Sequence, residues 1–238
     1  MGARPHGARC ALKRCVQSEL GGGSRQLPSE RRAILSAVSA ATQIPLFGSG
    51  ELACNETFAG LERTDLGDGA WVDHVPAWLS GEQGLFELLR DRLAWRSESR
   101  TMYEREVDVP RLLASIGDAH VHPVIERMRT VLGARYGEEF ARTSAALYRD
   151  GRDSVAFHGD FPARRMTIDT AVATISLGAP RTFRVRRKGG GPSRTWSLGG
   201  GDLFVMGGSC QRTHEHAIPK AQRASARIAL MYRPVWTE

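Results

Sequence analysis

The sequence predicts a mostly β protein in which a core of short strands is flanked by helices. Three observations predict this fold class. The 238 residues include 41% hydrophobic and 25% charged side chains, which are globular proportions and exclude a fibrous repeat or a wholly disordered chain. From about residue 152 onward, short segments rich in β-branched and aromatic residues alternate with Gly and Pro. Upstream of them lie two segments with the apolar spacing of amphipathic helices.

The first 44 residues are expected to form a disordered basic leader. Residues 1–32 carry seven basic and two acidic side chains, and Gly, Ser, Pro and Arg are too frequent for a packed core. The segment lacks the apolar centre of a secretory signal, and no apolar run reaches the roughly 18 residues of a membrane helix. The four cysteines form no CxxC pair. We therefore expect a soluble, cytoplasmic protein that is monomeric and has no membrane partner.

Residues 45–140 are predicted to be a helical region that packs on the core. Ser80 and Gln83 have the spacing of a capping box before a run of apolar residues. Pro123 is a typical first residue of a second helix, which we expect to end at Gly137. The acid and the histidines before this helix are interpreted as parts of a loop; they are Asp118, His120 and His122.

Residues 141–238 are predicted to contain the β core. Their strand-like segments are DSVAFH, DTAVATISLG, RTFRVRRK, RTWSLGGGDLFVMGG and ARIALMYRP. Turn residues bound these segments, which together indicate six or seven strands. Short strands at nearly regular spacing are typical of a sandwich, a barrel or a jelly roll.

Two residues at the end of a predicted strand are candidate metal ligands. His158 and Asp160 are separated by one residue, so their side chains leave the same face of an extended strand. A third ligand, either His214 or His216, follows another predicted strand. Two histidines and one carboxylate form the facial triad of non-haem Fe(II) oxygenases, which leaves positions open for a co-substrate and dioxygen.

Two arginines in the last predicted strand are candidate partners for a carboxylated co-substrate. Arg227 and Arg233 lie six residues apart, so both point to one face of an extended strand. They would be roughly 20 Å apart on a straight strand, and a twist or a turn is needed for both to contact one small ligand. The planar guanidinium suits this task because it donates two parallel hydrogen bonds to a carboxylate.

Residues 147–234 resemble the AlkB family of 2-oxoglutarate- and Fe(II)-dependent dioxygenases. The resemblance is carried, in order along the chain, by H-x-D, S-L-G-A-x-R, G-D-L-x-V-M-G-G, Q-R-x-x-E-H-x-x-P-K and R-x5-R. The upstream segments GAWVDHVPAWLSG and MYEREVDVPRLL extend it to roughly residues 45–235. It implies a double-stranded β-helix, or jelly roll, with helices and a nucleotide-recognition lid from the N-terminal part.

The same resemblance implies roles for individual residues. Arg227 would pair with the C5 carboxylate of 2-oxoglutarate, Arg233 would approach its C1 end, and Tyr148 would hydrogen-bond it. The implied iron ligands, which are also the catalytic residues, are His158, Asp160 and His216.

Several positions depart from the family pattern. Ala146, Ala229 and Met231 stand where polar residues often contact the co-substrate, so its binding is expected to be weaker by about 0.5 to 1.5 kcal/mol for each lost hydrogen bond. Phe161–Pro162 follow the H-x-D motif where some members carry an acid that contacts the damaged base. Ser115–Ile116 occupy a place where an aromatic residue commonly faces the substrate.

The implied activity is that of a DNA oxidative demethylase acting in the repair of DNA damage. With Fe(II), 2-oxoglutarate and dioxygen it would demethylate bases such as 1-methyladenine and 3-methylcytosine, releasing formaldehyde. The substituted base must be single-stranded or flipped out. An oxygenase acting on RNA, protein or a small molecule is an alternative, as is a nucleic-acid-binding module with a decayed site.

A basic stretch is the candidate nucleic-acid contact. Residues 141–238 carry sixteen basic and seven acidic side chains. Within them Arg184, Arg186 and Lys188 would contact phosphates. The alternative is a solvated edge strand, in which charged side chains prevent aggregation. This alternative includes Arg181 and Arg187 in addition to the three residues above.

Overall fold

The computed structural model describes residues 50–102, 105–117, 121–160 and 167–234. The expected leader of residues 1–44 lies outside the described residues. So do Asp118 and His120, and the Phe161–Pro162 pair.

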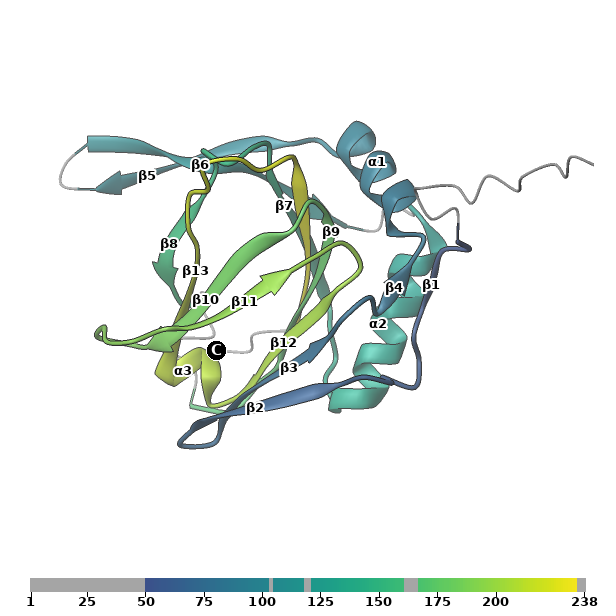
Figure 1. The fold of residues 1–238 in the computed structure, drawn as a ribbon, viewed down its shortest axis with the longest axis horizontal. Coiled ribbons are helices and arrows are strands. Elements are labelled where there is room, and N and C mark those ends of the chain that lie inside the picture. Colours follow the sequence, from purple (N-terminus) through teal and green to yellow (C-terminus); the bar gives the residue numbers. More distant parts are fainter. Residues whose placement is uncertain (1–49, 103–104, 118–120, 161–166, 235–238) are drawn as a thin grey trace, which may run out of the picture. The chain divides into compact units, whose positions relative to one another are not determined.

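Two antiparallel sheets form the β core of the described residues (Figure 1). The larger sheet has eight strands in the order β2 (Glu62–Gly67), β3 (Ala70–Val75), β12 (Leu203–Gly208), β9 (Val172–Gly178), β14 (Arg227–Arg233), β7 (Arg142–Tyr148), β6 (Arg105–Ile116) and β5 (Arg96–Met102). The smaller sheet has four, in the order β11 (Arg194–Leu198), β10 (Arg181–Arg187), β13 (His214–Ile218) and β8 (Val155–His158). A short pair, β1 (Ala53–Cys54) and β4 (Leu79–Ser80), stands apart from both.

The two faces of the larger sheet cover different cores. In β14, Ile228 and Leu230 belong to the core formed with α1 (Glu82–Arg92) and α2 (Pro123–Tyr136), whereas Ala229 belongs to the core between the sheets. This alternation follows from the two-residue period of a strand. A third, short helix, α3 (Cys210–Thr213), links β12 to β13. The arrangement confirms the predicted mostly β fold class with a jelly-roll core.

The predicted second helix is confirmed and the predicted cap of the first is wrong. Helix α2 begins at Pro123 and ends before Gly137, which has a φ of 67°. The cap of α1 is instead Gly81, with a φ of 63° and no side-chain hydrogen bond. The Ser80 hydroxyl does not cap this helix. It precedes the cap residue and donates to the backbone carbonyls of Glu51 and Ala53. None of the helices in the described residues combines the length and the apolar character needed to cross a membrane.

The region of residues 45–140 contains more strand than the helical interpretation predicted. Four of its strands, β2, β3, β5 and β6, belong to the larger sheet. Strand β2 reads ERTDLG and has no buried residue, so it lacks a run of buried apolar residues that would mark it as a strand. The basic strand β10 lies between β11 and β13, so the prediction of an edge strand there is wrong.

Candidate metal centre

Two histidines face each other across the smaller sheet. His158, the last residue of β8, is paired with His216 of β13, and their ring centroids are 4.4 Å apart. The pairing register shifts between this pair and the next, Val155 with Ile218, so that two residues of β8 oppose one of β13. This is a β-bulge, a feature that re-aims side chains near functional sites. Phe157 and His158 are consecutive strand residues whose side chains leave opposite faces, so Phe157 contacts Arg186 while His158 lines the space between the sheets.

Asp160 completes the group predicted from the sequence. The possible ligand atoms of His158, Asp160 and His216 all lie within 4.8 Å of one another. The Nδ1 atom of His158 lies 2.8 Å from the carbonyl oxygen of Ala156. A carbonyl only accepts, so Nδ1 carries the proton and Nε2 is left as the metal-binding atom. The geometry therefore selects His216, rather than His214, as the third member.

The electrostatics of the three residues suit a divalent metal. Burial, with a smaller contribution from His158, lowers the pKa of His216 to about 3, so this imidazole is neutral. Burial alone would raise the pKa of Asp160, but the positive charge of Arg233 and its hydrogen bond to the carboxylate lower it below its ordinary value. The donor set is two imidazoles and one carboxylate, which fits Fe(II) and leaves coordination positions open.

Arg233 connects the candidate metal ligands to the larger sheet. Its Nη2 donates to Oδ1 of Asp160 at 3.0 Å, and its Nη1 donates to the Ser144 hydroxyl at 2.7 Å. Arg233 and Arg227 line one pocket together with the three candidate ligands, so both side chains reach one site despite their spacing along the strand. The histidines enter this pocket from the smaller sheet and the arginines from the larger one.

Arg227 is a buried cation with an open hydrogen-bonding fork. Its exposed fraction is 0%, and burial lowers its pKa to about 10, which leaves it charged at neutral pH. Its Nε donates to the Ser176 hydroxyl at 2.8 Å. Its Nη1 and Nη2 atoms have no hydrogen-bond partner among the residues that the structure describes. Buried polar groups are normally paired, so this open fork fits a carboxylate.

Tyr148 and Arg111 line the same pocket. Tyr148, predicted from the sequence, is 1% exposed and accepts a hydrogen bond from Nη1 of Arg111 at 3.1 Å. Arg111 was missed by the sequence analysis because β6 was taken for part of a helical region. Its signal was a single arginine within the apolar segment VPRLL. Of the departures from the family pattern, Ala229 and Met231 also line the pocket.

The three predicted phosphate contacts do not share one environment. Arg184 is exposed. Arg186 instead donates to Glu215 at 2.6 Å and lies 3.7 Å from the Phe157 ring centroid, and Lys188 donates to backbone carbonyls. Arg181, the first basic residue of the strand, is not part of a solvated face, because it is only 3% exposed.

Comparisons with known proteins agree with this geometry. The model of the 2OG-Fe(II) oxygenase superfamily matches residues 85–233. The chain is 25% identical over 178 residues to the human alpha-ketoglutarate-dependent dioxygenase alkB homolog 3, covering 65% of the chain and 62% of the relative. It is 29% identical over 150 residues to the human DNA oxidative demethylase ALKBH2, covering 53% of the chain and 57% of the relative. The chain thus spans about three fifths of the length of these relatives.

A solved structure has the same fold. The structure of OsALKBH1 aligns with a TM-score of 0.50 and 15% sequence identity, covering 73% of this chain and 100% of that chain. At this identity the likeness concerns the fold alone.

Proposed function

Because the chain belongs to the 2OG-Fe(II) oxygenase superfamily, we propose that it is an iron- and 2-oxoglutarate-dependent dioxygenase that demethylates alkylated nucleic acid bases. One observation carries the oxygenase part of this proposal. The pocket that holds the His158, Asp160 and His216 triad also contains the open fork of Arg227. A metal and a carboxylate would thereby share one cavity.

The bound metal and co-substrate would supply the oxidation, in which an N-methyl group, dioxygen and 2-oxoglutarate become N–H, formaldehyde, succinate and carbon dioxide. The chain supplies binding and orientation. His158, through Nε2, would hold Fe(II) with the other two ligands, and Arg233 keeps the Asp160 carboxylate ionised and in place. Arg227 and Tyr148 would hold the distal carboxylate of 2-oxoglutarate.

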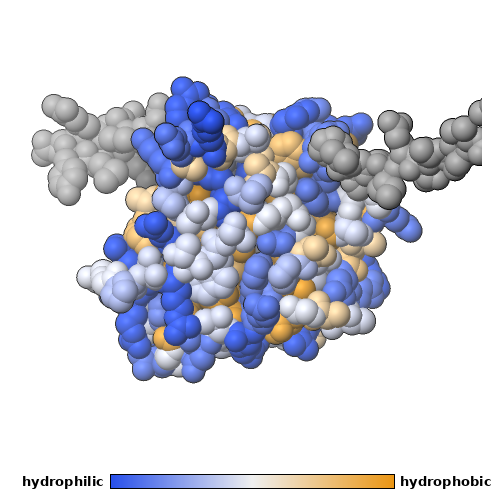
Figure 2. Space-filling model, in the orientation of Figure 1, coloured by the Kyte–Doolittle hydropathy of each residue, from blue (hydrophilic) through white to orange (hydrophobic). Residues whose placement is uncertain are grey.

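Nucleic acid is the proposed substrate because of the relatives and the charge. One relative is named a DNA oxidative demethylase, and residues 141–238 carry nine more basic than acidic side chains. Figure 2 shows hydrophilic residues spread over the viewed face, with hydrophobic residues scattered among them. A methyl on N1 of adenine or N3 of cytosine blocks pairing, so single-stranded or flipped bases would be the substrates.

The test compares methylated single-stranded DNA, methylated RNA and the free nucleosides in parallel. We expect formaldehyde and succinate in equal amounts from oligonucleotides that contain 1-methyladenine or 3-methylcytosine. His158→Ala should abolish both products. The matched control is His122→Asn, because His122 caps α2 through Nδ1 and Asn preserves such a cap.

The products distinguish the alternatives. Product from RNA alone would retain the mechanism and reject DNA as the substrate. Succinate without formaldehyde from any nucleic acid would favour an oxygenase of proteins or small molecules. Turnover by His158→Ala equal to that of the control would remove this triad from the site.

A further inference from the structure

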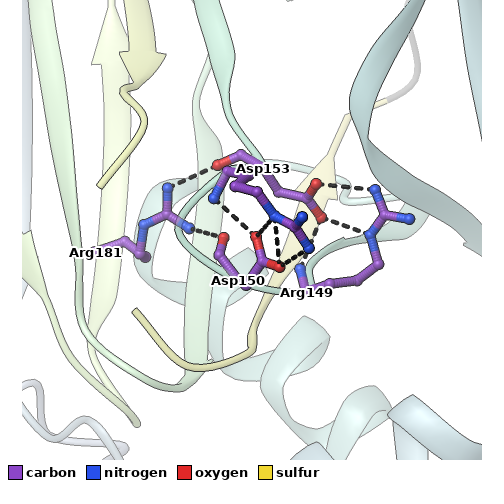
Figure 3. A network of polar contacts seen from close by, with 5 residues as sticks. Arg149, Asp150, Asp153 and Arg181 are labelled. Atoms are coloured by element: carbon purple, nitrogen blue, oxygen red, sulfur yellow. Dashed lines mark hydrogen bonds and ion pairs between the residues drawn. The ribbon is translucent and has the colours of Figure 1, made fainter. Parts of the chain in front are cut away.

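Arg181 lies behind the co-substrate pocket and ties together two connections of the core. It is the first residue of β10. Its Nη1 donates to the carbonyl of Asp150 at 3.0 Å, and its Nη2 donates to the carbonyls of Asp153 at 2.8 Å and Pro219 at 2.9 Å. Figure 3 shows its guanidinium directed at the connection between β7 and β8. The chain immediately before that connection carries Tyr148.

The carboxylates nearest to Arg181 are directed to other arginines. The Asp153 carboxylate accepts from Nε and Nη2 of Arg149 at 2.8 and 2.9 Å. The Asp150 carboxylate pairs with Arg152. Among the described residues, Arg181 thus has backbone carbonyls as partners and no ion pair.

Arg181 and Arg227 approach the same aromatic ring. The Cζ atom of Arg181 lies 5.5 Å from the ring centroid of Tyr148, and that of Arg227 lies 5.6 Å from it. Both distances are within the range of cation–π contacts. Burial lowers the pKa of both guanidinium groups, and the charge of Arg181 further lowers that of Arg227.

Neither of these two buried cations has an ion pair among the residues that the structure describes, which leaves positive charge at this end of the pocket. Burying charge is unfavourable unless an opposite charge compensates it. A dianionic ligand whose second carboxylate reaches Arg227 would compensate both cations at once. A ligand without that carboxylate would gain nothing from either.

We propose that Arg181 is a positioning residue for the distal carboxylate of a 2-oxo dicarboxylic acid, acting through Tyr148 and Arg227 and through its positive charge. The proposal rests on the proposed function, because it assumes that 2-oxoglutarate occupies this pocket. It assigns no direct contact to Arg181, which does not line the cavity.

The test measures ligand binding rather than turnover. Anaerobic protein loaded with Mn(II) is titrated with 2-oxoglutarate and with 2-oxopentanoate, which has the same chain length but lacks the distal carboxylate. Arg181→Gln should weaken 2-oxoglutarate binding by about tenfold and change 2-oxopentanoate binding less than twofold. Arg181→Lys, which retains a cation, should regain part of the loss. The matched control is Arg152→Gln, which removes an exposed guanidinium from the same connection.

A second variant keeps the proposal testable if Arg181→Gln does not fold. Arg227→Met leaves Arg181 in place and should retain a preference of a few fold for 2-oxoglutarate over 2-oxopentanoate. Complete loss of that preference would overturn the proposal.

The other outcomes separate this proposal from the proposed function. Wild-type protein that binds no 2-oxoglutarate would reject the proposed function itself. With wild-type binding intact, equal loss of both ligands in Arg181→Gln would show a purely structural role. Unchanged 2-oxoglutarate affinity, or no gain in Arg181→Lys over Arg181→Gln, would likewise overturn the role of the charge.

Discussion

Replacing Arg227 by lysine keeps the positive charge and removes the fork. The arginine offers two free Nη atoms to a carboxylate, and a hydrogen bond to a charged group contributes about 1.5 to 3 kcal/mol. Lysine would retain one such bond. Part of this loss of binding free energy is offset, because the ligand-free lysine variant does not bury the unpaired Nη atoms that the ligand-free wild type buries. We therefore expect a loss of about 2 kcal/mol of binding free energy, or roughly a thirtyfold increase in the Kd of 2-oxoglutarate.

Calorimetric titration of anaerobic protein loaded with metal measures this Kd directly. The metal affinity should change less than twofold, because the three candidate ligands do not contact Arg227. The control is Arg142→Lys, an exposed substitution on neighbouring strand β7. A Kd for 2-oxoglutarate within threefold of the wild-type value would show that Arg227 does not bind the carboxylate.

Three further predictions concern the surface, acid stability and the start of a helix. Log affinity for a methylated single strand falls as log salt concentration rises, and Arg184→Ala should make this fall less steep by about 0.7. Arg186→Ala should leave the steepness unchanged, and equal slopes for both variants would contradict this. The pKa of Asp153 is lowered because its ion pair and hydrogen bonds outweigh burial, so its stabilisation is present above about pH 4 and is lost as pH falls through the folded-state pKa. The free energy of unfolding measured with urea should accordingly differ most between Asp153→Asn and the wild type near pH 7. A difference that grows on acidification would refute the predicted direction of the pH dependence. Ser80→Ala should lower the free energy of unfolding by about 1 kcal/mol in the same assay, whereas Gln83→Ala should lower it by less than 0.3 kcal/mol. Equal losses in the two variants would support the predicted capping box.

Local patterns made the candidate metal centre visible in the sequence. His158 and Asp160 are two residues apart, and the ordered motifs around them identified His216 as the third member, so no long-range geometry had to be inferred. Helix α2 was predictable for the same reason, since Pro123 and Gly137 act on their own turns. The resemblance to the AlkB family, read from those motifs, is confirmed by the family and curated matches.

The incorrect predictions share one cause, which is contact between residues that are far apart in the sequence. The Ser80 hydroxyl bonds the carbonyls of Glu51 and Ala53, 29 and 27 residues away, which no capping pattern reveals. Strand β2 exists because β3 pairs with it, not because its own residues favour a strand. Arg181 looks like the other basic residues of its strand, and only the carbonyls of distant connections make it a buried residue.

The division of the pocket between two sheets has a mechanical consequence. The candidate metal ligands His158 and His216 belong to one sheet, while Arg227 and Tyr148 belong to the other. A small molecule that joins the metal to Arg227 is then a non-covalent crosslink across the core. Separation of the sheets breaks that crosslink, so bound ligand opposes unfolding by an amount that grows with its concentration above Kd. Metal and 2-oxoglutarate together should therefore raise the melting temperature by more than the sum of their separate effects.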